Sequence, residues 1–304
     1  MAQAVTAAGL AGLSRFVELV RERGAELYRD LPWRRTCDAY AVLVSEVMLQ
    51  QTQVSRVLGR WEEWVERFPS IDSLAAAPLP EVLGRWQGMG YNRRALALKR
   101  CAEACSSAGG VLPSDYRELL ALPGIGPSTA AGVCVFAYGQ QQVYLETNVR
   151  AVFLHEFYAH CDKVPDKELV PLVQAACSLD AATRPDGPRT WYYALLDYGA
   201  YLKKTVPNPS RRSAHHVRQS CFEGSSRQKR AELLRCMLAQ GTLSDVELES
   251  ALAAFELAAG RVAPDYEEVE RLMEGLERDG LVVAAPNGAG GHDEGAQKSW
   301  SLGA

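Results

Sequence analysis

The stretch YAVLVSEVMLQQTQV, residues 40–54, places one carboxylate, Glu46, inside an otherwise uncharged run. Apolar residues recur at the spacing of one face of an amphipathic helix, and Asp38 is placed to cap its N-terminus. The apolar face consists of Tyr40, Leu43, Val44, Val47 and Met48. Glu46 lies at the margin of this face, where partial desolvation would raise its pKa and keep a proton on it near neutral pH. Two interpretations stay open: a general acid, or an ordinary glutamate at the edge of a core helix.

Length and composition describe an ordinary globular protein. The chain has 304 residues, 47% of them hydrophobic, which suggests roughly two domains. No apolar run reaches the ~20 residues of a membrane span, and the N-terminus lacks the pattern of a signal peptide, so we expect a cytoplasmic protein without membrane contact. The eight cysteines include no CxxC pair, which favours reduced thiols and no metal site.

The net charge of −4 hides a basic segment. Residues 203–230 hold eight basic side chains and one acidic side chain, interrupted by Pro207 and Pro209. Such a segment is typical of a loop that faces phosphates, although a solvated linker between domains has a similar composition. Gln51 and Thr52, directly after the Glu46 helix, have side chains suited to hydrogen-bonding base edges. Both features favour DNA as the partner.

Two motifs follow in a body whose pattern is helical from about residue 10 to residue 206, which predicts an all-α fold. In LPGIGPSTA, residues 122–130, Gly124, Ile125 and Gly126 form the turn of a helix–hairpin–helix. Its glycines and the following helix N-terminus suit a phosphate, and its carbonyls suit a monovalent cation. A plain corner between two helices is the alternative.

The second motif is ETNV, residues 146–149, at the start of another helix. Glu146 is either a helix cap or a second functional carboxylate. Two carboxylates on either side of a phosphate-binding hairpin suit cleavage of a glycosidic bond, which needs an acid for the leaving group and an anion beside the developing cation.

These motifs, together with RDLPWR (29–34) and GMGYNRR (88–94), resemble the helix–hairpin–helix (HhH-GPD) DNA glycosylase superfamily and its MutY-like adenine glycosylase branch. The resemblance covers about residues 10–222. It implies a two-lobed body, with one lobe of residues 1–30 plus 143–222 and a six-helix-barrel lobe of residues 31–142. It also implies a base-excision-repair enzyme that flips adenine from a mispair with 8-oxoguanine or guanine in double-stranded DNA.

The resemblance assigns roles to individual residues. Glu46 would protonate the purine leaving group, and Glu146 and Asn148 match the segment of the second catalytic carboxylate. Arg29, Trp33 and Leu49 would line the pocket for the flipped base. Gln51, Thr52 and Tyr91 would contact the opposite base or wedge beside it.

The sequence departs from the family at Glu146, Tyr193 and Lys203, and at Ser128 it differs from the bifunctional relatives. Glu146 stands where aspartate is usual, and Tyr193 stands at the position of a glutamate that reads adenine. Ser128 replaces the lysine of bifunctional relatives, so we expect a monofunctional enzyme that uses water. Lys203 stands at the first cysteine ligand of an iron–sulfur cluster, so we expect no cluster and a basic segment that contacts phosphates instead, through Lys203, Lys204, Arg211 and Arg212.

Residues 226–304 predict helices over 227–240, 243–255 and 266–279 and then a β-ribbon with a glycine-rich tip. This resembles a winged-helix module in place of the Nudix-like domain of the adenine branch. Its third helix is acidic and would repel phosphate, which favours packing against the catalytic body or a protein partner. We expect a monomer. Alternatives to adenine excision are a glycosylase for hypoxanthine, cytosine, uracil or thymine, and a catalytically inactive DNA-binding protein.

Overall fold

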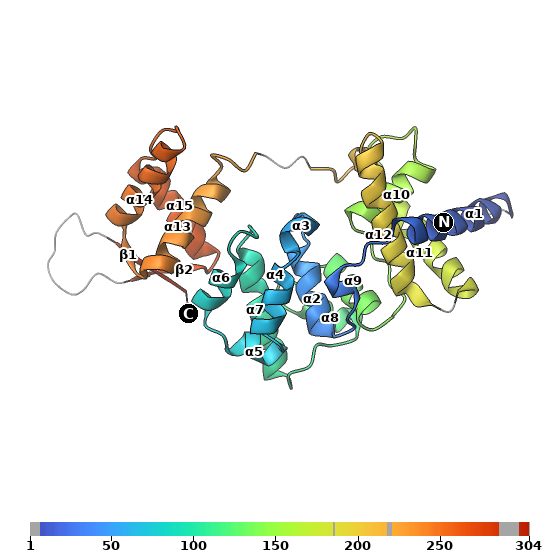
Figure 1. The fold of residues 1–304 in the computed structure, drawn as a ribbon, viewed down its shortest axis with the longest axis horizontal. Coiled ribbons are helices and arrows are strands. Elements are labelled where there is room, and N and C mark those ends of the chain that lie inside the picture. The colour runs from blue at the N-terminus through green and yellow to red at the C-terminus, as the bar shows by residue number, and fades with distance from the viewer. Residues whose placement is uncertain (1–6, 185, 218–220, 286–297, 304) are drawn as a thin grey trace. The chain divides into compact units, whose positions relative to one another are not determined.

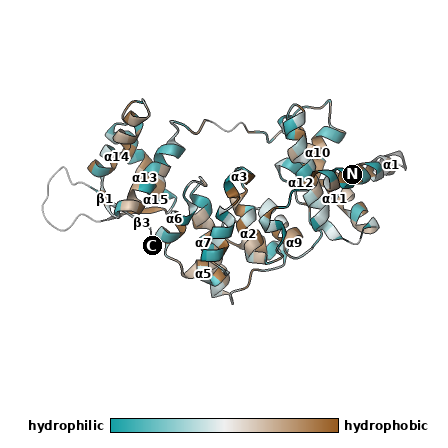
Figure 2. Ribbon diagram, viewed as in Figure 1, coloured by the Kyte–Doolittle hydropathy of each residue, from teal (hydrophilic) through white to brown (hydrophobic). Residues whose placement is uncertain are grey.

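The computed structural model describes residues 7–184, 186–217, 221–285 and 298–303. The chain is 66% helical with 4% in strands, which confirms the all-α prediction for the body (Figure 1). The helices carry both apolar and polar residues (Figure 2), as expected where one face of a helix packs inward and the other meets water. Among the described residues, no helix is both long and apolar enough to cross a membrane.

The chain forms two compact units. The first comprises Met1–Glu46, Leu112–Ala121 and Ile125–Arg218, and the second comprises Val47–Val111, Leu122–Gly124 and Gln219–Ala304. Helix α2 (Ala39–Met48) therefore begins in the first unit and ends in the second. The division into lobes expected from the sequence stays a prediction.

The first unit is built from helices around α12. Its other elements are α1 (Ala7–Leu27), η1 (Pro32–Arg34), α8 (Tyr116–Ala121), α9 (Pro127–Phe136), α10 (Thr147–Phe157), α11 (Asp166–Thr183), α12 itself (Gly187–Thr205) and η2 (Pro209–Arg212). Helix α12 packs against α1, α10 and α11. Phe16, Phe153 and Trp191 meet in this core, with ring centroids 5.0 Å apart for the phenylalanine pair and 6.3 Å apart for Phe16 and Trp191.

The second unit contains α3 (Val54–Val57), α4 (Arg60–Arg67), α5 (Ile71–Ala76), α6 (Leu79–Trp86) and α7 (Arg93–Ser107). Its core is aromatic. Trp64 is buried between Phe68 and Trp86, with ring centroids at 5.0 Å and 5.3 Å in edge-to-face geometry. Such pairs stabilise a fold beyond the area they bury.

The C-terminal module belongs to the second unit. Its helices α13 (Ser226–Gln240), α14 (Asp245–Ala258) and α15 (Tyr266–Arg278) confirm the three predicted helices. Strands β1 (Leu243–Ser244), β2 (Val282–Ala285) and β3 (Ser299–Leu302) form an antiparallel sheet in the order β1-β3-β2, with Val282 opposite Leu302. The two ribbon strands were predicted, whereas their glycine-rich tip lies outside the described residues. The assignment as a winged helix stays a prediction.

Helix α2 forms as its sequence predicts. Asp38 Oδ1 accepts a hydrogen bond from the backbone N–H of Ala41 at 2.8 Å, which caps the helix. The five apolar residues of the predicted face are all buried. The helix thus holds Glu46 in a fixed place within the first unit.

Candidate active site

Glu46 packs its carboxyl group against helix α9. A Cβ atom built on Gly132 would lie 2.1 Å from Glu46 Oε2 and 3.1 Å from the ring of Tyr144. Real Cβ atoms do not approach other atoms that closely, so any side chain at position 132 would displace the carboxyl group. Gly132 therefore makes room for Glu46, a role that the sequence pattern did not reveal.

Tyr144 is the hydrogen-bond partner of Glu46. Its hydroxyl donates to the carboxyl group, which lowers the pKa of Glu46, while burial and the nearby charge of Glu146 raise it. Burial is the largest of these effects, and the pKa of Glu46 rises to about 8. The carboxyl group therefore holds its proton at neutral pH, as a general acid must. The carboxyl group of Glu46 is thus surrounded by protein, whereas the residue taken as a whole is partly exposed.

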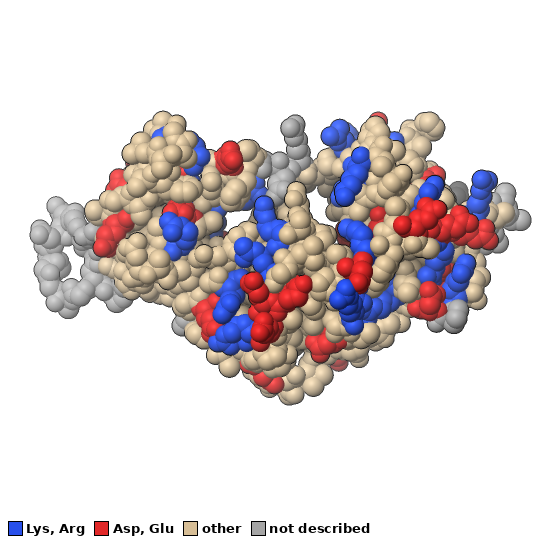
Figure 3. Space-filling view, in the orientation of Figure 1, with Lys and Arg blue, Asp and Glu red and all other residues tan. Residues whose placement is uncertain are grey.

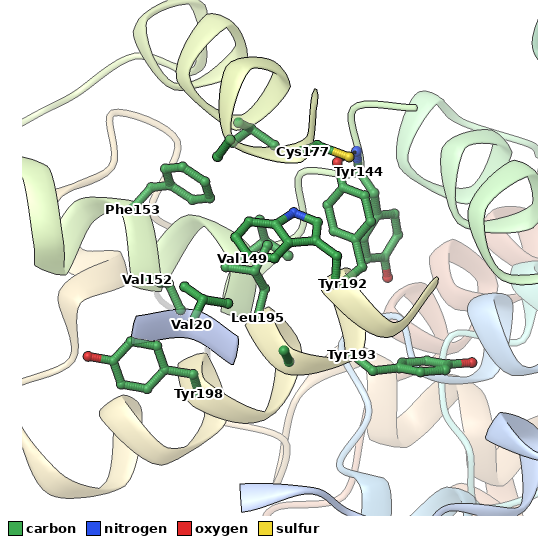
Figure 4. Close-up of a cluster of buried hydrophobic side chains, with 14 of the residues drawn as sticks. Val20, Tyr144, Val149, Val152, Phe153, Cys177, Tyr192, Tyr193, Leu195 and Tyr198 are labelled. Atoms are coloured by element: carbon green, nitrogen blue, oxygen red, sulfur yellow. Dashed lines mark hydrogen bonds between the residues drawn. The ribbon is translucent and has the colours of Figure 1, made fainter. Parts of the chain in front are cut away.

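Two aromatic neighbours fix Tyr144. Its backbone N–H donates to the Tyr192 hydroxyl at 3.1 Å, and that hydroxyl donates to Gln142 O at 2.7 Å. The rings of Tyr144 and Tyr192 meet edge to face with centroids 5.5 Å apart, and they lie side by side in Figure 4. Phe136 packs against Tyr144 in the same geometry at 5.1 Å. Tyr144 is thus held where its hydroxyl reaches Glu46.

The second predicted carboxylate, Glu146, is the N-cap of α10. Its Oε1 accepts hydrogen bonds from the backbone N–H groups of Asn148 at 2.6 Å and Val149 at 3.1 Å. Burial is the largest effect and raises the pKa of Glu146, although these two hydrogen bonds and the charges of Lys203 and Arg150 oppose the rise. The structure therefore brings Glu46 and Glu146 close enough to interact electrostatically, and it also contains the capping interaction that was the alternative interpretation.

Lys203 reaches the same segment from α12. Its Nζ donates to Asn148 Oδ1 at 3.1 Å. Gly199, one turn earlier, permits this approach, because a Cβ atom there would lie 2.2 Å from Asn148 O. Lys204 and Arg211 are exposed, and Arg212 donates to Leu154 O at 3.5 Å. Basic and acidic side chains are interspersed on the face drawn in Figure 3.

A buried carboxylate, Asp197, binds Arg29, one of the predicted base-pocket residues, together with Arg34. Asp197 accepts hydrogen bonds from Arg29 Nε at 2.5 Å and from both terminal nitrogens of Arg34 at 2.7 and 2.8 Å. The Arg34 guanidinium lies 4.4 Å from the ring centroid of Tyr193. Trp33 is buried next to Arg34 in the chain. The sequence motif identified Arg29 and Trp33 but did not identify Asp197 and Arg34.

Tyr193 is a neutral phenol in this setting. Its ring stacks on Phe136 with centroids 4.7 Å apart and planes 8° from parallel. Burial is the largest effect and raises its pKa to about 12; the charges of Arg189 and Arg34 oppose the rise, and Glu46, once ionised, adds to it. Tyr193, predicted to stand at the position of an adenine-reading glutamate, therefore has its hydroxyl within electrostatic range of Glu46.

The residues predicted to contact the opposite base lie in two loops of the second unit. Gln51 and Tyr91 both adopt the left-handed backbone conformation, with φ of 52° and 51°. Arg94 joins the two loops, a role that the sequence did not reveal. It donates to the backbone oxygens of Val47, Met48, Gln50, Met89 and Gly90 and to the Thr52 hydroxyl, at 2.7 to 3.1 Å. Leu49, partly buried, belongs to the first loop.

The predicted hairpin joins α8 to α9. Gly124 has φ of +73°, and a Cβ atom there would lie 2.4 Å from that of Ala97. Both the backbone conformation and the lack of space therefore require glycine. Ile125 is buried, and Gly126 is the N-cap of α9 with Pro127 after it. Ser128 is exposed in the first turn of α9. Phosphate and cation binding by this hairpin stay predictions.

Metal ligands are sparse where the resemblance implies an iron–sulfur cluster. Such clusters are held by four cysteine thiolates. Cys221 is the one cysteine in the sequence between α12 and α13. Lys203, at the predicted first ligand position, is hydrogen-bonded to Asn148. Within the described ranges, no group of three or more His, Cys, Asp or Glu side chains is placed to hold a metal ion. The residues present do not fit the cluster.

Residues 44–277 match the family described as the HhH-GPD superfamily of base excision DNA repair proteins. The chain belongs to this superfamily. It is therefore a DNA N-glycosylase, and its relatives place it in the adenine glycosylase branch, which confirms the resemblance seen in the motifs.

Curated relatives of this glycosylase include two mycobacterial proteins. It is 32% identical over 284 residues to the adenine DNA glycosylase of Mycobacterium tuberculosis, a match that covers 86% of this chain and 88% of that protein. It is 42% identical over 174 residues to the adenine DNA glycosylase of Mycolicibacterium smegmatis, covering 57% and 58% of the two chains. A thermostable thymine-DNA glycosylase of known structure superposes with a TM-score of 0.55 at 25% identity, over 64% of this chain and 88% of that one.

Proposed function

We propose that this glycosylase excises adenine mispaired with guanine or 8-oxoguanine, as a monofunctional enzyme without an iron–sulfur cluster. The observation that carries the proposal is the pairing of a protonated acid with a second carboxylate in one unit. Glu46 has its pKa raised to about 8 by burial, and Glu146 lies near it at the start of α10. The names of its curated relatives support adenine as the base.

The proposed reaction divides the work between these two groups. After the base is flipped from the duplex, Glu46 donates its proton to a ring nitrogen as the N-glycosidic bond breaks, so that the bonding electrons leave with a neutral base. Glu146, as a carboxylate, stabilises the positive charge that develops on the sugar. A water molecule then bonds to the anomeric carbon and releases its proton to a carboxylate. None of these steps requires a metal ion or a lysine nucleophile.

Tyr144 and Asn148 complete the proposed machinery. Tyr144 donates to Glu46 and orients the carboxyl group, whereas Asn148 is held by the Lys203 ammonium at 3.1 Å. The charge of Lys203 opposes the rise in the pKa of Glu146 that burial causes, and it thereby supports the anionic form that the developing cation needs. This gives Lys203 a second use besides the phosphate contact expected from the sequence.

A second candidate is a different target base. Tyr193 offers a hydroxyl where adenine recognition would use a carboxylate acceptor, and a mismatched hydrogen-bond pattern costs about 1 to 3 kcal/mol per buried group. One structural relative is named for thymine. This pattern supports testing pyrimidines and hypoxanthine alongside adenine.

The test is a single-turnover excision assay on duplexes that carry adenine, hypoxanthine, cytosine, uracil or thymine opposite each normal base and 8-oxoguanine. Alkali added afterwards reveals abasic sites. Adenine excision that is retained or improved in Tyr193→Glu supports the adenine assignment. Excision of a pyrimidine with none of adenine would contradict it.

A further inference from the structure

A hydrogen-bonded segment, residues 208–214, occupies the part of the chain where the resemblance implies a cluster loop, and we call it the strap. The hydroxyl of Ser210, a buried residue, donates to Thr147 O of α10 at 3.3 Å. The backbone N–H of Val164 donates to Arg212 O at 2.8 Å, which ties the strap to the loop before α11. The strap therefore lies against the start of α10 and is held there by hydrogen bonds.

Helix α12, which precedes the strap, packs against the same α10, and the two helices lie side by side in Figure 1. Gly199 leaves room for the backbone of α10, since a Cβ atom there would lie 2.2 Å from Asn148 O. One turn later, Lys203 Nζ donates to Asn148 Oδ1 at 3.1 Å. Lys203 and Asn148 are both partly exposed. Helix α12 thus holds the backbone and the side chain of Asn148 at a site that a substrate can reach.

The hydrogen bond from Lys203 decides which way the Asn148 amide faces. An ammonium group has donors and no acceptor, so the amide oxygen faces Lys203 and the N–H2 group is turned away from it. In the same turn, Glu146 Oε1 accepts from the backbone N–H groups of Asn148 and Val149. A carboxylate and a pair of N–H donors are therefore fixed two residues apart. Side-chain amides are common donors to the phosphate and sugar oxygens of DNA.

Lys203 is also the stronger of two cations that act on Glu146. Burial raises the pKa of Glu146, and the charges of Lys203 and Arg150 oppose the rise, with the larger effect from Lys203. The Arg150 guanidinium makes two hydrogen bonds to a carboxylate of α11, at 2.9 and 2.7 Å. The titratable groups Glu46 and Tyr144 also interact with Glu146, and both hold their protons at neutral pH. Lys203 therefore contributes most to keeping Glu146 ionised among these side chains.

We propose that Lys203 is a positioning residue of the excision reaction, and that Lys203 and the strap form a metal-free replacement for the cluster loop. Lys203 fixes the Asn148 amide so that its N–H2 group meets the sugar–phosphate backbone of the flipped nucleotide, with the Glu146 carboxylate beside it. This inference rests on the proposed base-excision function, because it assigns a role in the same reaction.

The experiment uses full-length wild-type protein and the variants Lys203→Met, Lys203→Arg, Asn148→Ala and Lys203→Met with Asn148→Ala. Lys167→Met is the matched control, since it removes an exposed lysine from α11 of the same unit. Single-turnover rates on adenine opposite 8-oxoguanine are measured with saturating protein over a range of pH. Affinities for a duplex with a stable abasic analogue are measured at several salt concentrations, and thermal unfolding checks that each variant folds.

Lys203→Met should lower the saturated rate about tenfold, the scale of one hydrogen bond to a charged group, while the affinity and its salt dependence stay near those of wild type. The acidic limb of the pH profile should move to higher pH, because loss of the cation raises the pKa of Glu146 and excision needs its carboxylate. Lys203→Arg keeps a cation and should recover most of the rate and the position of the limb. In the Asn148→Ala background Lys203→Met should cost less than in wild type, and Lys167→Met should match wild type.

The opposite pattern would overturn the proposal. A wild-type saturated rate in Lys203→Met, with weaker binding and a salt dependence reduced by about one charge, would make Lys203 a phosphate contact only. Strictly additive effects of Lys203→Met and Asn148→Ala would also contradict positioning through the amide. Should Lys203→Met fail to fold, Lys203→Gln, which is also neutral, takes its place in each comparison.

A readout that needs no excision separates this proposal from the proposed function. The side-chain amide signals of Asn148 in nitrogen-15 NMR spectra are identified by their loss in Asn148→Ala. They should shift in Lys203→Met and stay in place in Lys167→Met. If wild type excises no base, the proposed function fails and these signals decide whether Lys203 fixes the amide; signals unchanged in Lys203→Met would show that it does not.

Discussion

Tyr144→Phe removes the hydroxyl group that donates a hydrogen bond to Glu46 and leaves the aromatic ring in place. The hydroxyl stabilises the ionised form of Glu46, so its removal should raise the pKa of Glu46 above its value of about 8. A hydrogen bond to a charged group contributes about 1.5 to 3 kcal/mol, which corresponds to about one to two pKa units. Excision needs protonated Glu46, so the rate falls as the pH rises through this pKa. The variant should keep its activity to a higher pH than wild type.

The assay is a single-turnover pH–rate profile from pH 5 to about 10, where the basic limb reports Glu46. At pH 6 the two proteins should differ only by the loss of orientation, since Glu46 is protonated in both. Tyr198→Phe is the control: its hydroxyl donates to Glu156 at 2.5 Å and is remote from the reaction in this account. A basic limb that stays in place, or moves to lower pH, would refute the link between Tyr144 and Glu46.

Three further predictions concern the same machinery. Gly132→Ala should lower the excision rate at least ~10²-fold with DNA affinity retained, because its Cβ would displace the Glu46 carboxyl group; a near-normal rate would show that the carboxyl group has room to move. Borohydride should trap no covalent adduct with DNA, since Ser128 cannot form a Schiff base, and strand cleavage should need alkali; efficient trapping would reveal a lysine nucleophile. Purified protein should be colourless and free of stoichiometric iron, whereas several iron atoms per chain would contradict the proposal of a clusterless enzyme.

Local features of the fold were predictable because they depend on neighbours in the sequence. The period of apolar residues and the cap at Asp38 define α2, and both are confirmed. The three C-terminal helices follow from the same periodicity. The raised pKa of Glu46 was also expected, from its place at the margin of an apolar face.

Contacts between distant segments were not predictable in this way. Tyr144 reaches Glu46 because Tyr192 and Phe136 fix its ring, and nothing in the local pattern around Tyr144 specifies those partners. Gly132 interrupts an apolar helix without any sign that a carboxyl group packs on it. Arg227 seemed part of a basic surface segment, yet the packing of the module directs it to Tyr91. These roles depend on tertiary packing, which periodicity does not encode.

Delivery of a proton from Glu46 to the departing base is tested by comparing wild type with Glu46→Gln in single-turnover excision of adenine opposite 8-oxoguanine. The amide keeps the shape of the carboxyl group but has no acidic proton. We expect unchanged binding of the duplex and a loss of at least ~10²-fold in rate, the usual scale for one general acid. A variant that excises adenine at close to the wild-type rate would contradict it.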